Sequence, residues 1–345
     1  MIPIRNVYYL LCYAWDSVEE ARALEPAGSE DFHRVQDLFG SILARGVLRV
    51  ARKGLDRSYV NFQEELPGVR GKLELTQTLK QTALLRNRIV CTFDDLSTDV
   101  IHNQVVASTL HLLAGHQDVD QGVKRALRLA LSRMPGVSIR PITRQIFARI
   151  QLDRNRREYR FLIHLCRLLH EVRLVDPGSG QSRFVEIDRG RLEMWRVFER
   201  FVTRFYAREQ TAFRVRAQSR VEWSSLKSVG PASEGRIPEM RPDVVLLGSG
   251  RRIVLDAKYA KSGGLGGEDG AKLNSSNLYQ LFAYVVNREA NEPEGPRHEG
   301  ILLYPTVGEE TRVEFLSHGH RFQARSVDLA RPWRALHEQL LGTLE

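Results

Sequence analysis

The chain has 345 residues, of which 42% are hydrophobic, so it can bury a sizeable core and we expect two domains. No apolar run is long enough to span a membrane, and three separated cysteines are typical of free thiols in a reducing compartment, so we expect a cytoplasmic protein. The net charge of +9 favours a polyanionic partner such as nucleic acid.

Helical and strand patterns alternate in the first part of the chain. Residues 34–50, 99–114 and 156–173 carry apolar side chains at helical spacing and predict amphipathic helices. Residues 57–75 contain two strand-like runs around the turn Pro67-Gly68, which predicts a β-hairpin or a small sheet. The run from Asp176 to Gly180 is the best candidate for a linker. We therefore expect an α+β region over residues 1–185.

The second part, residues 186–345, predicts a mixed α/β layer fold. A helix over 191–207 precedes two short apolar strands, 243–247 and 253–257, which the tight turn Gly248-Ser249-Gly250 joins into a hairpin. A glycine-rich loop over 262–270 leads to a helix over 276–288, which Ser275 or Ser276 would cap, and then to a buried strand over 300–305.

Acidic and basic residues stand at the ends of the predicted hairpin. Side chains alternate along a strand, so Asp256 and Lys258 would project together while Ala257 packs behind them. The hairpin would bring Asp243 beside Asp256. Two neighbouring carboxylates repel each other and favour a divalent cation, and a few hard oxygen ligands with open positions for water and phosphate suit Mg²⁺. We expect Asp243, Asp256 and the backbone carbonyl of Ala257 to be its ligands.

Lysine is scarce in this chain, since only eight of the 51 basic residues are lysines. Lys258 would orient or help deprotonate a metal-bound water, or stabilise the charge of the transition state. The pKa of a lysine can shift for this work, whereas that of a guanidinium cannot. Glu199 on the preceding helix is a candidate third carboxylate, and Gln280 and Tyr284 share one face of the following helix. The alternative is a surface hairpin with a cross-strand salt bridge and a solvated Gln280.

These residues carry a resemblance to a known family. The pattern Asp243, Asp256-Ala257-Lys258, with Glu199 before it and Gln280 and Tyr284 after it, resembles the PD-(D/E)xK nuclease superfamily. More narrowly, the chain resembles the McrC family, the nuclease subunits of McrBC modified-cytosine restriction systems. The segments that carry this likeness are IPIRNVYY (2–9), LPGVRGK (66–72), LDAKYAKS (255–262), NLYQLFAYV (277–285) and ILLYPTV (301–307).

The resemblance implies a type IV restriction endonuclease subunit that works with a partner. That partner is an McrB-like AAA+ GTPase, which forms a hexameric ring and recognises double-stranded DNA with modified cytosine. The resemblance assigns binding of this ring to residues 1–185 and the nuclease domain to residues 186–345. The sequence agrees with the need for such a partner, because it has no G-x-x-x-x-G-K-[ST] motif to bind a nucleoside triphosphate.

Two other functions stay open from the sequence alone. The domain could be a self-sufficient nuclease that needs no motor, or the chain could be a non-catalytic adaptor that activates a GTPase. The arginine-rich stretch from Arg140 to Arg160 could lie along DNA, contact an acidic partner, or form a solvated helix face.

Overall fold

The computed structural model describes residues 2–24, 32, 34–153, 156–171, 173–175, 182–184, 194–224, 236–259 and 273–345. The chain divides into two compact units: unit 1 is Met1–Glu19 with Ile187–Glu345, and unit 2 is Glu20–Glu186. The expected division at residue 185 therefore needs one change, because the first 19 residues pack with the C-terminal part of the chain. Among the described helices, none is long and apolar enough to cross a membrane.

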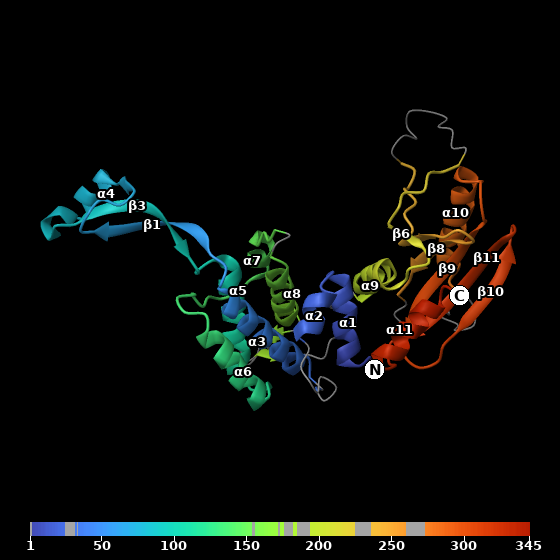
Figure 1. Ribbon diagram of the computed structural model, residues 1–345, viewed down its shortest axis with the longest axis horizontal. Helices are drawn as coiled ribbons and strands as arrows, with labels where there is room; N and C mark the ends of the chain where they lie inside the picture. Colours follow the sequence, from blue (N-terminus) through green and yellow to red (C-terminus); the bar gives the residue numbers. More distant parts are fainter. Residues whose placement is uncertain are drawn as a thin grey trace. The chain divides into compact units, whose positions relative to one another are not determined.

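Unit 2 contains a group of packed helices, which bury apolar side chains against one another (Figure 1). The helices predicted over 34–50, 99–114 and 156–173 are confirmed. The helices of this unit are α3 (Val35–Lys53), α5 (Ile101–Gly115), α6 (Gln121–Ser132), α7 (Arg144–Arg149) and α8 (Arg157–Glu171), and α2 (Val18–Leu24) begins in unit 1. After α8 come two short antiparallel strands, β4 (Arg173–Val175) and β5 (Ser182–Phe184). The expected linker at 176–180 lies outside the described residues.

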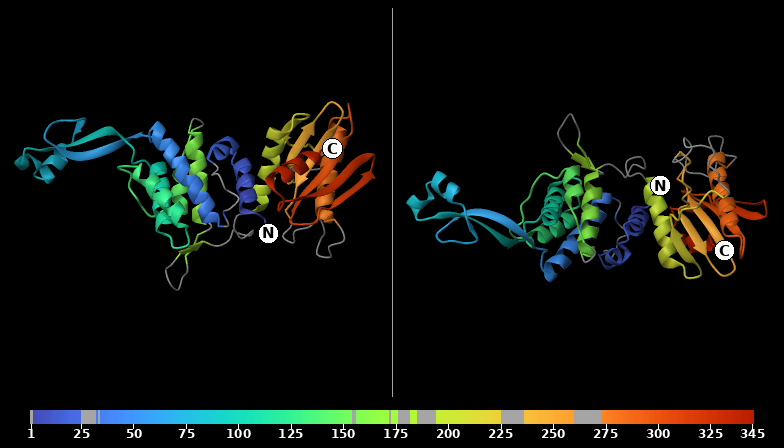
Figure 2. Two further views of the ribbon diagram at one scale, coloured as in Figure 1. Left: turned by 60° about the horizontal axis from the view of Figure 1, so that its bottom comes forward. Right: turned by 90° about the horizontal axis from the view of Figure 1, so that it is seen from above.

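An arm, residues 58–97, extends from these helices in both views of Figure 2. Its elements are β1 (Ser58–Leu66), β2 (Lys72–Leu73), α4 (Leu75–Lys80), the 3-10 turn η2 (Ala83–Arg86) and β3 (Ile89–Ser97). The strand order is β1-β3-β2, so the small sheet is confirmed, but β1 pairs with β3 and not with the run that follows it. A Cβ atom on Gly71 would lie 2.5 Å from the carbonyl oxygen of Thr92, so glycine allows this close approach to β3.

Unit 1 is built on a mixed six-stranded sheet with the order β10-β11-β9-β8-β7-β6. Strands β8, β9 and β11 run parallel, whereas the other pairs are antiparallel. The strands are β6 (Arg214–Ala217), β7 (Val244–Leu247), β8 (Arg252–Ala257), β9 (His298–Thr306), β10 (Arg312–Ser317) and β11 (His320–Asp328). The hairpin predicted over 243–257 is therefore confirmed, as is the strand over 300–305, while the glycine-rich loop at 262–270 lies outside the described residues.

Helices cover both faces of this sheet (Figure 1). One face packs on α1 (Ile4–Ala14), α9 (Met194–Glu209) and α11 (Trp333–Gly342), and the other packs on α10 (Ser275–Asn291). The first 19 residues belong to unit 1 because Leu10 and Tyr13 of α1 are buried in the core of the first face. The predicted serine cap of α10 is wrong, since the side chain of Asn274 accepts the hydrogen bond from the Asn277 N–H.

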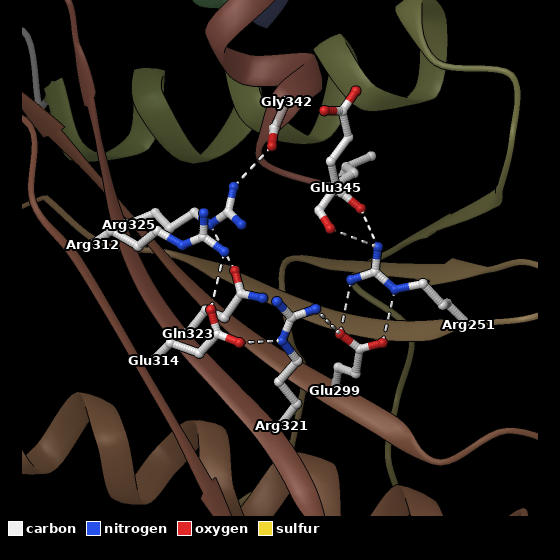
Figure 3. A network of polar contacts seen from close by, with 10 residues as sticks. Arg251, Glu299, Arg312, Glu314, Arg321, Gln323, Arg325, Gly342 and Glu345 are labelled. Carbon is white, nitrogen blue, oxygen red and sulfur yellow. Dashed lines mark hydrogen bonds and ion pairs between the residues drawn. The ribbon is translucent and has the colours of Figure 1, made fainter.

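The outer strands β10 and β11 carry arginines and glutamates on the face opposite α10 (Figure 3). The guanidinium of Arg251 donates two hydrogen bonds of 2.8 Å to the carboxylate of Glu299. Glu314 accepts from Arg321 at 2.6 Å and from Arg312 at 3.0 Å. These arginines are therefore neutralised within unit 1.

Candidate functional site

The β7–β8 hairpin brings two aspartates together on one face of the sheet. Val244 pairs with Leu255, so continuing the ladder by one residue places Asp243 opposite Asp256. By strand alternation, both side chains lie on the face of Val254, which packs on α10. The Ala257 N–H donates to Oδ2 of Asp243 at 2.7 Å, and this bond fixes the first carboxylate at the end of the hairpin.

Lys258 follows the last residue of β8 and stays in register with the sheet. Its backbone N–H donates to the carbonyl oxygen of Leu303 at 2.8 Å, so the alternation of side chains continues past the end of the strand. The Nζ atom of Lys258 lies 2.5 Å from Oδ2 of Asp256. The expected projection of Asp256 and Lys258 to the same side is thus present, while Ala257 packs against the core on the opposite face.

Helix α10 adds an amide and a phenol to this group. The ammonium of Lys258 donates to Oε1 of Gln280 at 2.7 Å, and Nε2 of Gln280 donates to the hydroxyl of Tyr284 at 2.7 Å. Gln280 and Tyr284 are one helical turn apart and therefore share a face. These contacts form a chain from Asp256 through Lys258 and Gln280 to Tyr284, which restricts where the ammonium can point.

Glu199 reaches the site from α9 and has a partner that the sequence analysis missed. Nε2 of Gln218 donates to Oε1 of Glu199 at 3.0 Å, and the backbone N–H of Gln218 donates to the carbonyl oxygen of Asp243, also at 3.0 Å. Gln218 has a φ of 44°, a left-handed conformation that is uncommon outside glycine. No motif marks this residue, because its role depends on β6 pairing with β7, a contact that local periodicity does not show.

Burial and mutual repulsion dominate the electrostatics of the two aspartates. Asp256 is 2% exposed and Asp243 is 9% exposed. Burial raises the pKa of Asp243, and the negative charges of Asp256 and Glu199 raise it further. Burial also raises the pKa of Asp256, although the adjacent Lys258 ammonium opposes this shift. One ammonium is thus insufficient to stabilise both carboxylates in their charged form, and a bound cation would supply the missing positive charge.

The donor set of this site fits a hard divalent cation. Oδ2 of Asp256 is buried, and the ammonium of Lys258 pairs with it at 2.5 Å. Within the described part of the chain, no three Asp, Glu, His or Cys side chains are close enough together to hold a metal. Two aspartates and the Ala257 carbonyl would therefore be the protein ligands. Such a small set of oxygen ligands suits Mg²⁺, which usually keeps several of its waters.

Three comparisons with known proteins each cover most or all of the chain. The family model described as "McrBC 5-methylcytosine restriction system component" matches residues 5–305. A protein of Escherichia coli (strain K12) named "Type IV methyl-directed restriction enzyme EcoKMcrBC" is 29% identical over 347 residues, covering 100% of this chain and 98% of that protein. Of the solved structures, a chain from a half-complex of Thermococcus gammatolerans McrB AAA+ hexamers with bound McrC matches with a TM-score of 0.56 and 16% identity. That match covers 99% of this chain and 76% of the other, and at this identity it shows a shared fold.

Proposed function

The chain belongs to the family of McrBC 5-methylcytosine restriction system components, and from this premise we propose that it is the subunit that cuts the DNA. The proposed activity is Mg²⁺-dependent hydrolysis of phosphodiester bonds in double-stranded DNA with modified cytosine. The proposed catalytic domain is the PD-(D/E)xK-type part of unit 1. One observation carries this proposal: the buried pair Asp243 and Asp256 lies beside a lysine that Gln280 holds in place.

Each residue of the site has a distinct part in the proposed reaction. Asp243 and Asp256, with the carbonyl of Ala257, would hold Mg²⁺. When bound, the ion lowers the pKa of a water and stabilises negative charge on the phosphate. Lys258 would place its ammonium beside the attacking water, and Gln280, itself bonded to Tyr284, would keep that ammonium in position. Glu199 would add negative charge near the two aspartates.

We further propose that a GTPase ring of the AAA+ type controls this activity. The chain has no phosphate-binding loop motif of its own, so a nucleotide-driven step requires another chain. The Thermococcus assembly is described as McrB AAA+ hexamers with bound McrC. Because the resemblance to the McrC family assigns ring binding to the N-terminal region, we propose that unit 2 docks on the ring.

The arm of unit 2 has the surface expected for such docking. Large apolar side chains that are exposed in one small region mark protein-binding sites. The arm exposes seven of them: Tyr59, Val69, Leu75, Leu79, Leu84, Leu85 and Leu96. The highest exposure, 85%, is at Leu85 in the turn η2. We therefore place the docking surface for the ring on the arm.

Cleavage of plasmid DNA tests the proposed activity. Cytosine-methylated and unmethylated plasmids are incubated with Mg²⁺, GTP and an McrB-like AAA+ protein from the same organism, and each component is left out in turn. We expect wild-type protein to cut methylated plasmid when all components are present. Lys258→Ala and Asp256→Ala should each lower the cleavage rate by about 10² to 10⁴-fold, the usual effect of losing a group that acts in proton transfer or charge stabilisation. Lys53→Ala, an exposed lysine of α3, is the matched control and should cut normally.

The same experiment separates the alternatives. Cutting without the AAA+ protein would remove the proposed motor dependence and leave the active site. Cutting by Asp256→Ala would refute the metal site. If wild-type protein never cuts but stimulates GTP hydrolysis, the chain is an adaptor. Under our proposal, Lys258→Ala loses cutting and keeps the stimulation of GTP hydrolysis.

A further inference from the structure

One segment of unit 2 contains no acidic residue. Between Asp120 and Asp153, residues 121–152 include six arginines and one lysine but no aspartate or glutamate. This acid-free segment therefore contributes +7 to a chain whose total net charge is +9. Acidic residues are otherwise frequent, with 42 in 345 positions, so the positive charge of the protein is concentrated here.

The acid-free segment is ordered against the helices of unit 2 and presents its arginines to solvent. In α6, Val123, Leu127 and Ala130 are buried. After α6, the N–H and hydroxyl of Ser138 donate to the carboxylate of Asp99 at 2.8 and 2.7 Å, just before α5. The backbone N–H of Arg140 then donates to the hydroxyl of Ser108 in α5 at 2.9 Å. The six arginines are all exposed: Arg125, Arg128, Arg133, Arg140, Arg144 and Arg149.

These arginines lack the carboxylate partners found elsewhere in the molecule. None of the six forms an ion pair with an acidic side chain of the described residues. Arg128 reaches only the carbonyl oxygen of Ala114, at 3.5 Å. In unit 1, by contrast, surface arginines such as Arg312 and Arg321 meet a glutamate (Figure 3). Arg125 and Arg140 still interact electrostatically with Asp120 and Asp99, and Lys124 is buried. The charge available to a partner outside the chain is therefore mainly that of the other four arginines: Arg128, Arg133, Arg144 and Arg149.

The kind of side chain that is exposed favours a nucleic acid as that partner. The centres of protein–protein interfaces are poor in charged residues, whereas DNA-binding surfaces are polar and strongly positive. Among the described residues of the segment, Leu129 and Ile139 are the large apolar side chains with high exposure, and arginines make up most of the remaining long side chains. A guanidinium also matches the two oxygens of a phosphate geometrically.

We propose that the acid-free segment, residues 121–152, binds the phosphate backbone of duplex DNA. This inference rests on the proposed function only in taking DNA as the substrate. It adds a DNA contact in unit 2 to the one proposed at the aspartates of unit 1. Backbone contacts of this kind position DNA without reading its sequence or its methylation. They also weaken steeply with salt, because binding releases condensed counterions.

The salt dependence of DNA binding by the full-length protein tests this proposal. The triple variant Arg133→Gln, Arg144→Gln, Arg149→Gln removes three exposed arginines that lack carboxylate partners. The control removes three exposed arginines of unit 1 that pair with acids: Arg204→Gln, Arg331→Gln, Arg334→Gln. Binding of a short fluorescein-labelled duplex is followed by anisotropy at several salt concentrations, in EDTA and without the AAA+ protein. Thermal melting verifies that both variants are folded.

We expect the first triple variant to make the plot of log affinity against log salt shallower by about 2 to 3, since each phosphate contact contributes about 0.9 to the slope. Methylated and unmethylated duplexes should lose affinity by the same factor, and the control should keep the wild-type slope. A wild-type slope in the first triple variant would overturn the proposal. So would loss of GTPase stimulation at an unchanged slope, which would assign the arginines to an acidic protein surface. The assay contains no Mg²⁺, so its result is independent of whether the protein cuts.

Discussion

Two exposed regions of unit 2, the arm and the acid-free segment, differ in the chemistry that they present. The arm (residues 58–97) has five basic and five acidic residues, and pairs such as Arg70 with Asp95 neutralise them. Its exposed surface is rich in leucine. The acid-free segment has a formal charge of +7, and its six exposed arginines form no ion pair with an acidic side chain of the described residues. Within one unit, an apolar surface and a basic surface favour different classes of partner, a protein for the first and DNA for the second.

Unit 1 contrasts with both regions, because its candidate active groups are buried. Asp243 and Asp256 lie at the ends of core strands, where burial strengthens the interaction between charges. Binding surfaces must be reachable by a macromolecule, whereas groups that polarise one water or one phosphate act best when they are held rigidly and partly desolvated. The following predictions test this division between the surfaces of unit 2 and the buried site of unit 1.

Apart from the active-site variants, the largest effect is expected from a charge placed on the arm. Leu85→Asp should weaken binding of the AAA+ protein by about 10 to 100-fold, because burial of one leucine is worth about 1.5–3 kcal/mol. Binding is measured by titrating the labelled AAA+ protein with GTP present. Leu316→Asp in unit 1 is the matched control, since Leu316 is 78% exposed. Weakened binding in the control but not in Leu85→Asp would move the docking surface to unit 1.

A smaller effect is expected from Gln218, which links Glu199 to the backbone of Asp243. Gln218→Ala should raise the Mg²⁺ concentration needed for half-maximal cleavage by up to about tenfold, because it removes one hydrogen bond of about 1 kcal/mol near the metal ligands. Binding of Mn²⁺, followed by its paramagnetic resonance signal, should weaken in parallel. Gln210→Ala alters another glutamine after α9 and should leave both values unchanged. If the rate falls at saturating metal while metal binding is unchanged, Gln218 does not support the metal site.

The smallest effect concerns stability without metal. Burial and the neighbouring carboxylates raise the pKa of Asp243 to about 8, so the folded state holds its proton more tightly than the unfolded state does. The stabilisation that this proton gives the folded state is fully present below about pH 4 and is lost as the pH rises through the folded-state pKa. In EDTA at neutral pH, Asp243→Asn should therefore be more stable than wild type by about 1 kcal/mol or more, since one pKa unit corresponds to about 1.4 kcal/mol.

Urea unfolding at pH 5 and pH 7.5 measures this difference. The advantage of Asp243→Asn over wild type should be greater at pH 7.5, and added Mg²⁺ should stabilise wild type more than the variant. Asp153→Asn, at an exposed position of unit 2, is the control and should show no such pH dependence. A variant that is less stable than wild type at both pH values would contradict the proposed repulsion between the aspartates.

The parts of the fold that follow from local patterns could be predicted from the sequence. The helix over 34–50 follows from helical periodicity. The hairpin that brings Asp243 beside Asp256 follows from strand patterns and a tight turn between them. Neighbouring residues specify both features. The contact between Lys258 and Gln280 follows from strand alternation and helix spacing once α10 packs on the sheet. The local sequence pattern is sufficient to predict these features.

Features that depend on distant pairing could not be predicted in the same way. Strand β3 lies between β1 and β2 although it follows both in sequence, and β11 lies between β9 and β10. Gln218 meets Glu199 because β6 pairs with β7 across a long connection. The affiliation of α1 with unit 1 was missed for the same reason, because Tyr13 packs on Phe201 and Phe205, far along the chain.

That affiliation has a consequence for how the protein is made. Because unit 2 is inserted between Glu19 and Ile187, the ribosome completes unit 2 while α1 still lacks the helix and sheet on which it packs. Unit 2 can fold during synthesis, since domains generally fold as units, but unit 1 must wait until residues 187–345 have been made. During that interval the apolar face of α1, including Leu10, has not yet met the core that buries it. A fragment that begins at residue 187 would lack this helix and expose Phe201 and Phe205 to solvent, so unit 1 is best produced with both of its segments.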